Sequence, residues 1–179
     1  PRLINVGIWR PVRLEWTDSV RIDAVTVYPE LTENHTSAKV VTRVFLDNVR
    51  AEAVSALLRL KVAEADVTTE MEVELPPGYS CHEICADISN PRLWWPRPYG
   101  DQPLYNLEIQ VEVAGKVVDT VHRRTGIRSI RINTDPHPEG GDYFILEVNG
   151  HPIFAKGGNW VPPDTIYARI APDHYRRLV

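Results

Sequence analysis

In two nine-residue stretches of this sequence, mostly apolar side chains alternate with polar ones at a period of two residues. One face carries Val67, Thr69, Met71, Val73 and Leu75 in the first stretch, and Tyr105, Leu107, Ile109, Val111 and Val113 in the second. Because successive side chains of an extended strand point to opposite faces of a sheet, one face of each stretch can be buried while the other stays in water. The two stretches therefore predict β-strands that cover a common core.

Further candidate strands surround these two. Weaker alternation covers Val20–Tyr28 and Ala38–Leu46, Ser80–Ile88 is another candidate, and Ala114-Gly115-Lys116 predicts a short turn into Val117–Arg123. The segment Ala51–Val62 has a helix-favouring composition, but its position between strands leads us to predict a strand there. About seven short strands over roughly 110 residues are typical of an immunoglobulin-like β-sandwich, which we assign to residues 17–133.

The composition is that of an ordinary globular protein and excludes several classes. The chain has 179 residues, with 20 Lys and Arg against 24 Asp and Glu, and its formal net charge is −4. It therefore lacks the basic surplus of a protein that tracks nucleic-acid phosphates. No apolar run approaches the ~18 residues of a membrane-spanning helix. We expect neither nucleic acid nor a membrane as a partner.

The chain has two cysteines, Cys81 and Cys85, four positions apart on one predicted strand. At the rise of an extended strand they would lie on the same face about 13 Å apart. A disulfide needs Cα atoms within about 7 Å, so the two cannot bridge each other. We expect free thiols, buried or half-buried. The low cysteine content favours a reducing compartment such as the cytoplasm.

The pattern changes after Asn133. A linker-like stretch (135–141) precedes a predicted strand at Tyr143–Val148, and Asn149-Gly150 is a strong signal for a hairpin turn into His151–Lys156. A loop rich in Gly and Pro follows, and Pro172 begins a predicted helix. This order suggests the opening of an α/β unit. Because the chain starts with Pro1 and the helix pattern runs to Val179, we expect an internal piece of a longer chain.

Few residues form a local chemical signature. The histidines are scattered and no phosphate-binding glycine pattern is present, so we expect no metal site and no cofactor. Three carboxylates near the end of the chain, Asp142, Glu147 and Asp164, are candidates because glycosidases use a carboxylate pair. We favour structural roles for them: a turn residue, a charge on a strand face and a loop or cap residue.

The aromatic residues are more informative. Trp94, Trp95 and Tyr99 lie within six positions. Exposed rings can stack on sugars, but aromatic side chains also bury large areas, and we favour a plug at the sandwich end or a domain interface for the tryptophan pair. Asn159 and Trp160 follow a glycine pair at a predicted strand end, where barrel enzymes collect their active-site residues. For these two residues, a sugar-facing and a structural role are both open.

Four stretches together resemble the family 2 glycoside hydrolases, and within them the β-mannosidases. Gly7–Val12 is similar to the end of the N-terminal jelly-roll domain, and Pro91–Tyr105 to the "N-P-x-L-W-W-P … G-x-Q-x-L-Y" signature of the sandwich domain. Arg124–Arg128 is similar to the exit strand of that domain, and Phe144–Asp164 to the entry into the catalytic (β/α)8 barrel. The four stretches occur in the family's order and cover nearly the whole chain.

The substrate class implied by the resemblance depends on one run. Relatives that act on galactosides or glucuronides usually carry an N-[RK]-H-E run after the first barrel strand. This chain has Asn159-Trp160-Val161-Pro162-Pro163-Asp164, which resembles the mannosidase pattern "G-x-N-W-[IV]-P-x-D". The resemblance implies that Asn159, Trp160 and Asp164 lie near the substrate. It also implies that domain interfaces involve Trp9, Arg10, Trp94, Trp95 and Tyr99.

The resemblance implies a domain plan. Residues 1–16 would be the last strand of a preceding jelly-roll sugar-binding domain, 17–133 the sandwich, and 134–179 the entry hairpin, first strand and first helix of a truncated barrel. Both catalytic glutamates of the family would lie beyond Val179, so no catalytic residue is expected in this chain and the chain alone is expected to be inactive.

The longer protein implied in this way would be a retaining, exo-acting enzyme whose partner is a carbohydrate, most simply a terminal β-mannoside. Two alternatives stay open: a stand-alone sugar-binding sandwich module built on the 94–99 cluster, or a parent acting on another β-glycoside, namely a galactoside, glucuronide or glucosaminide. The sequence leaves the oligomeric state open.

Overall fold

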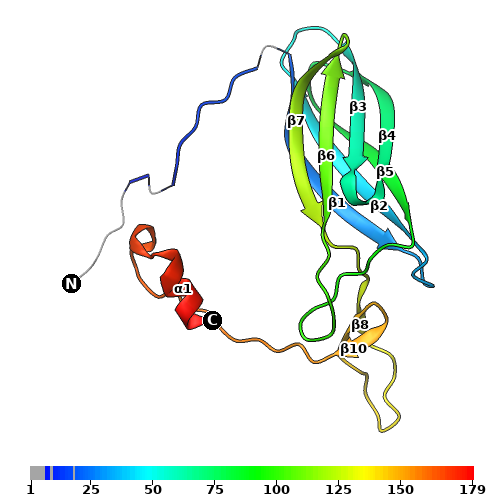
Figure 1. The fold of residues 1–179 in the computed structure, drawn as a ribbon, viewed down its shortest axis with the longest axis vertical. Helices are drawn as coiled ribbons and strands as arrows, with labels where there is room; N and C mark the ends of the chain where they lie inside the picture. Colours follow the sequence, from blue (N-terminus) through cyan, green and yellow to red (C-terminus); the bar gives the residue numbers. More distant parts are fainter. Residues whose placement is uncertain (1–6, 9, 18) are drawn as a thin grey trace. The chain divides into compact units, whose positions relative to one another are not determined.

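A computed structural model describes residues 7, 8, 10–17 and 19–179. Its largest part is a β-sandwich of two antiparallel sheets (Figure 1). One sheet has the order β1-β2-β5, and its strands are β1 (Val20–Leu31), β2 (Ser37–Asn48) and β5 (Gly78–Ser89). The other has the order β4-β3-β6-β7, with β3 (Val54–Val62), β4 (Val67–Leu75), β6 (Tyr105–Val113) and β7 (Lys116–Thr125). The prediction of an all-β sandwich is confirmed.

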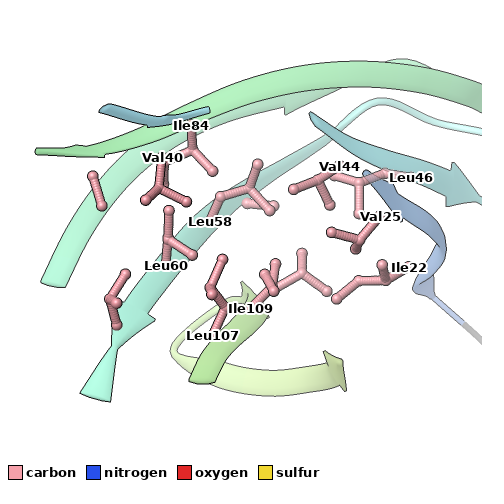
Figure 2. Packing of buried hydrophobic residues seen from close by; sticks show 14 of the residues in the cluster. Ile22, Val25, Val40, Val44, Leu46, Leu58, Leu60, Ile84, Leu107 and Ile109 are labelled. Carbon is pink, nitrogen blue, oxygen red and sulfur yellow. The ribbon is translucent and has the colours of Figure 1, made fainter. Parts of the chain in front are cut away.

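The core of the sandwich consists of the side chains that alternate inward from both sheets. Figure 2 shows Val40, Val44, Leu46 and Ile84 from the first sheet facing Leu58, Leu60, Leu107 and Ile109 from the second. The inward positions of β6 are all buried, as its two-residue period predicts. The inward positions of β4 are mostly half-buried, because β4 lies at the edge of its sheet. Each fully buried aliphatic side chain contributes about 1.5–3 kcal/mol through removal of apolar surface from water.

Local sequence signals set the connections between strands. Ala114 and Gly115, between β6 and β7, both have positive φ values of 51° and 76°, as a tight hairpin turn with a twist matched to the strands requires. The segment whose composition favoured a helix contains β3, so the prediction of a strand there is confirmed. A short 3-10 helix, η1 (Ala63–Ala65), joins β3 to β4, and Asp66 follows it in the left-handed region with φ 51°.

The two cysteines lie on the outward face of β5, and both are free. Cys85 is half-buried, as expected, and burial raises the pKa of its thiol. Cys81 is exposed, so the expectation that it would be buried or half-buried was wrong. The reason is that the outward face of this sheet is open to solvent next to Cys81, where the neighbouring Tyr79 and Glu83 are exposed as well.

A second, smaller antiparallel sheet follows the sandwich. It has the order β10-β9-β8, and its strands are β8 (Ile130–Asn133), β9 (Ile145–Val148) and β10 (His151–Ile153). The Asn149-Gly150 turn between β9 and β10 is the hairpin predicted from the sequence, with φ values of 51° and 74°. Figure 1 shows this small sheet beyond the end of the sandwich at which β7 finishes.

Thr17–Phe154, which contain both the sandwich and the small sheet, form one compact unit. The rest of the described chain is assigned to a second unit, which contains η2 (Tyr167–Arg169) and α1 (Pro172–Leu178). The helix begins at the predicted proline. The continuation into a barrel is not visible in these residues, and the domain limits at 16 and 133 stay predictions.

Residues 7, 8 and 10–17 have no regular secondary structure, and Trp9 lies outside the described residues. No helix in the described residues is both long enough and apolar enough to cross a membrane.

Candidate functional site

The loop of residues 91–104, called the tryptophan loop below, joins β5 to β6 and carries most of the predicted interface residues. Hydrogen bonds from three of its backbone amides hold it in place. The amide of Trp94 donates to the carbonyl oxygen of Ile127 at 2.8 Å, and the amide of Trp95 donates to that of Asp101 at 2.8 Å. The amide of Arg92 donates to the hydroxyl of Tyr105 at 2.8 Å. The loop is therefore anchored to the start of β6 and to the segment that follows β7.

Trp94 is half-buried and packed against three groups of its own chain. The guanidinium carbon of Arg128 lies 4.7 Å from the centroid of its ring, which is the geometry of a cation–π contact. Gly126 lies directly beside the ring: a Cβ at this position would be 2.8 Å from two ring carbons. The side-chain amide of Asn149 donates to the carbonyl oxygen of Trp94 at 3.1 Å. The ring of Trp94 can therefore pack at this position only because residue 126 has no side chain.

Trp95 is held in a similar way. A Cβ at Gly100 would lie 3.0 Å from its ring, and the ring of His151 meets it edge-on with centroids 5.2 Å apart. The side-chain amide of Gln102 donates to the carbonyl oxygens of Trp95, at 2.9 Å, and of Gly100. Tyr99 accepts the amide hydrogen of Phe154 at its hydroxyl, at 3.2 Å. The loop therefore connects the sandwich to the β9–β10 hairpin.

Beside the loop lies an open groove of about 630 Å³, lined among others by Arg92, Trp95, Tyr99 and Asp101. Trp95 is half-buried and Tyr99 is 46% exposed. Trp95 does not form a flat, free platform of the kind on which a sugar stacks, because its ring is packed against His151 and Gly100. The structure brings Trp94, Trp95 and Tyr99 together in this loop.

Asn149 is a polar residue of this junction that the sequence indicated only as a turn former. Its exposed fraction is 1%. Its backbone amide donates to the carbonyl oxygen of Ser129 at 3.0 Å, and its side-chain oxygen accepts from the amide of Ser129 at 2.9 Å. With the bond to Trp94, one side chain links the small sheet, the segment after β7 and the tryptophan loop. Its position in an N-G turn was the available signal, because Asn tolerates left-handed φ and also carries a donor and an acceptor.

The residues expected near the substrate lie in the second unit. Trp160 is 55% exposed and stacks on Tyr175, with ring centroids 6.4 Å apart and planes inclined by 27°. Asp164 accepts a hydrogen bond from Nε of Arg169 at 2.6 Å and another from the amide of Ile166 at 2.8 Å. These bonds, that of Arg169 above all, lower the pKa of Asp164. Asn159 is exposed in the same loop, and Arg10 is exposed near the other end of the chain.

The other two candidate carboxylates are in structural surroundings. Glu147, on β9, accepts a hydrogen bond from the side-chain amide of Asn133 at 2.9 Å and lies 4.0 Å from Nε of Arg131. It is a charge on a strand face, as predicted. Asp142 is exposed and forms an isolated β-bridge with Pro136. In the part of the chain that the structure describes, no three His, Cys, Asp or Glu side chains cluster as metal ligands.

Comparison with known proteins gives the relationships of this chain. Residues 20–128 match the model of the family described as glycosyl hydrolases family 2. The chain is 30% identical over 179 residues to beta-mannosidase B of Aspergillus fumigatus, covering all of this chain and 21% of that protein.

Solved structures agree with this relationship. The crystal structure of the beta-D-mannosidase from Dictyoglomus thermophilum has a TM-score of 0.76 and 31% identity, covering 90% of this chain and 20% of that one. The exo-chitosanase of Amycolatopsis orientalis has the same fold, with a TM-score of 0.71 at 22% identity over 86% of this chain and 17% of that one. The chain thus spans about a fifth of the length of the relatives it matches. Because the family match covers more than half of its residues, the chain belongs to the glycosyl hydrolases family 2.

Proposed function

We propose that this chain is the central part of a longer, retaining β-mannosidase, in which it holds neighbouring domains in place and supplies no catalytic carboxylate. Membership of the glycosyl hydrolases family 2 supports hydrolysis of a glycosidic bond by the longer protein. Two relatives whose names include β-mannosidase, 30% and 31% identical, support a terminal β-mannoside as its substrate. The exo-chitosanase, at 22% identity, bears on the fold alone.

The packing of the tryptophan loop is the observation that carries the scaffold role. A sugar-binding module would present Trp94 and Trp95 as free platforms. Instead, the ring of Trp94 packs against Gly126 and Arg128, and the ring of Trp95 packs against Gly100 and His151. Aromatic rings used in this way contribute buried area and fixed geometry to a junction. We infer that the loop sets the position of the small sheet against the sandwich, and that Trp9, Arg10 and Tyr99 serve domain interfaces of the longer protein.

The finer fold assignment belongs to the same proposal. The strand order β1-β2-β5 opposite β4-β3-β6-β7 supports an immunoglobulin-like sandwich. The small sheet, the loop of residues 155–166 and α1 would then open a catalytic (β/α)8 barrel, and residues 1–16 would end a jelly-roll domain. In that arrangement Asn159, Trp160 and Asp164 would follow the first barrel strand, at the barrel face where active sites form.

The chemistry of the longer enzyme would be double displacement. Two carboxyl groups about 5–5.5 Å apart would act at the sugar carbon, one as nucleophile and the other first as acid and then as base, so that configuration is retained. In this chain, Glu147 is engaged with Asn133 and Asp164 with Arg169. The hydrogen bonds from Arg169 and from the amide of Ile166 hold Asp164 within its own loop and lower its pKa, so we assign it to shaping that loop.

A panel of nitrophenyl β-glycosides tests the proposal, with the 179-residue chain and the longer protein assayed side by side. We expect the longer protein to hydrolyse the β-mannoside and the chain alone to be inert. Activity of the chain alone would overturn the location of the catalytic groups, and Asp142, Glu147 and Asp164 would be the residues to replace first. Activity of the longer protein on a galactoside, glucuronide or glucosaminide only would remove the sugar assignment and keep the mechanism.

A binding assay separates the scaffold role from a sugar-binding module. We expect the 179-residue chain to show no saturable binding of manno-oligosaccharides by calorimetry. Binding that is lost on replacement of Tyr99 by Ala would overturn the scaffold assignment of the tryptophan loop.

A further inference from the structure

The small sheet β8–β10 has two faces of different character. The register places Ile130 opposite Val148 and Ile132 opposite Leu146, and it places Leu146 opposite Ile153. Residues opposite each other in antiparallel strands point to the same face. These aliphatic side chains therefore share one face of the sheet.

The polar side chains of β8 and β9 lie on the other face and have partners there, whereas His151 of β10, opposite Val148, shares the aliphatic face and packs edge-on against Trp95. Arg131 pairs with Asp135 at 2.8 Å, and Asn133 donates to Glu147 at 2.9 Å. Arg131 and Asn133 on the polar face therefore find their partners within this chain.

The apolar face is covered at one end only. Val148, next to the junction with the tryptophan loop, is 3% exposed. Ile130 and Ile132 are 57% and 52% exposed, Leu146 and Ile153 are half-buried, and Phe144, directly before β9, is 83% exposed. Strands of three or four residues have little stability without packing on one face. A contiguous exposed apolar patch on a folded unit marks a surface that another partner covers.

Another face of this unit with exposed aromatic side chains is different. On the outward face of the β1-β2-β5 sheet, Arg21 donates to the hydroxyl of Tyr79 at 3.3 Å, and the guanidinium carbon of Arg43 lies 5.7 Å from the centroid of the Tyr28 ring. Charged guanidinium groups thus lie next to those rings, so this face is polar and can remain exposed to solvent. Among the residues of β8, β9 and β10, the aliphatic face carries no Arg, Lys, Asp or Glu, and its one polar side chain, His151, lies at the end next to Trp95.

We propose that the face formed by Ile130, Ile132, Leu146 and Ile153 docks against an aliphatic surface of another domain of the same, longer polypeptide. This inference rests on the proposed function, since it requires the longer protein. The relatives are about five times as long as this chain, so further domains are available on the same polypeptide, where the tether gives them a high effective concentration. The patch also lies directly after residues 20–128, which match the family, and directly before the second unit at residue 155.

A paired stability measurement tests the docking. The variant with Ile130→Ser and Ile132→Ser is made in the 179-residue chain and in the longer protein. In the chain alone both side chains are exposed, so we expect the midpoint of thermal unfolding to stay within about 1 °C. In the longer protein both would be buried, and we expect the midpoint to fall by at least about 5 °C. The control is Arg131→Ser, on the same strand but on the opposite face, which should change both midpoints by less than about 1 °C.

Hydrogen exchange gives a second readout. We expect the amides of residues 145–153 to exchange at least about tenfold more slowly in the longer protein than in the chain alone, and the double variant to remove this difference.

Each other outcome overturns the proposal. Equal losses in both proteins would mean that the face is already packed within this chain, and no loss in either would mean that it stays in water. Self-association of the chain alone that the double variant abolishes, measured by sedimentation, would assign the face to a second copy. Hydrolysis of the β-mannoside by the unsubstituted longer protein reports the proposed function separately, so either idea can fail without the other.

Discussion

The backbone amide of Ile22 on β1 donates a hydrogen bond to Oδ2 of Asp119 on β7, with the two atoms 2.7 Å apart, and so joins one sheet of the sandwich to the other. The bond forms where β1 departs from regular pairing with β2, between Ile22 and Ala24. β1 and β7 are both outer strands of their sheets, and the carboxylate of Asp119 supplies an acceptor for this amide where the two edges meet.

We therefore expect Asp119→Ala to lower the free energy of unfolding by about 1–3 kcal/mol, because a partly buried amide loses a charged acceptor. Asp119→Asn keeps a carbonyl oxygen at this position and should lose less than half as much. Urea denaturation of the 179-residue chain measures both values. Equal losses for the two variants would show that the acceptor at this position does not matter.

The close packing of Trp94 against Gly126 gives a second prediction. A methyl group at residue 126 would lie 2.8 Å from the ring, so Gly126→Ala should lower the free energy of unfolding by about 1–3 kcal/mol through overpacking. The matched control is Gly157→Ala, since nothing lies within 4 Å of a Cβ at that position. Near-ultraviolet circular dichroism of the tryptophans should change for the first variant only. A stable Gly126→Ala chain with an unchanged spectrum would contradict the close packing of Trp94 on Gly126.

Asn149 gives a third prediction, because it combines a left-handed backbone with two partly buried side-chain hydrogen bonds. Asn149→Ala should cost about 2–4 kcal/mol of unfolding free energy, the sum of lost hydrogen bonds and a less favourable backbone. Asn90 also has positive φ, at 47°, but is exposed, so Asn90→Ala serves as the control for the backbone contribution. Thermal unfolding of the two variants compares them. Similar losses at positions 149 and 90 would leave no contribution from the side-chain bonds.

A fourth prediction concerns pH. His82 lies on the inward-facing side of β5 with its Nε2 3.1 Å from Oγ of Ser80, and burial lowers the pKa of its ring. The unfolded chain takes up a proton near the ordinary pKa of about 6.5, whereas the folded chain resists this until lower pH. The free energy of unfolding should therefore fall as the pH drops through about 6.5 and level off below the pKa of the folded state.

The variant His82→Gln should remove this part of the pH dependence, and His122→Gln, which replaces an exposed ring, is the control. Denaturant midpoints between pH 5 and pH 8 measure the slope. An unchanged slope in the His82 variant would mean that other groups cause the loss of stability in acid.

The strands of this protein could be predicted because their signals are local. The alternation in β4 and β6, the Ala114-Gly115 turn and the Asn149-Gly150 turn each depend on residues adjacent in the chain, and each was found where the sequence placed it. Strand ends were less accurate: β9 begins at Ile145 rather than Tyr143, and β10 stops at Ile153. Short edge strands end where tertiary contacts end, which no local pattern encodes.

The contacts of the candidate site could not be predicted in the same way. Trp94 is 32 positions from Gly126 and 55 from Asn149, and nothing in the spacing of these residues indicates that they meet. The exposure of Cys81 was misjudged for the same reason, because burial depends on which face of the sheet another layer covers. The resemblance identified the tryptophan loop as important, whereas only the folded structure gives the residues on which it rests.

The alternation in β4 has a consequence for how copies of this chain behave when crowded. β4 is an outer strand of its sheet, and its solvent side presents Glu70, Glu72 and Glu74 in a row. A β4 strand from another molecule that added to this edge would bring a second row of carboxylates alongside the first. Their repulsion opposes the growth of continuous sheets from molecule to molecule, which is the first step of amyloid-like assembly. The alternation that buries one side of β4 thus also places the carboxylates that disfavour polymerisation through its open edge.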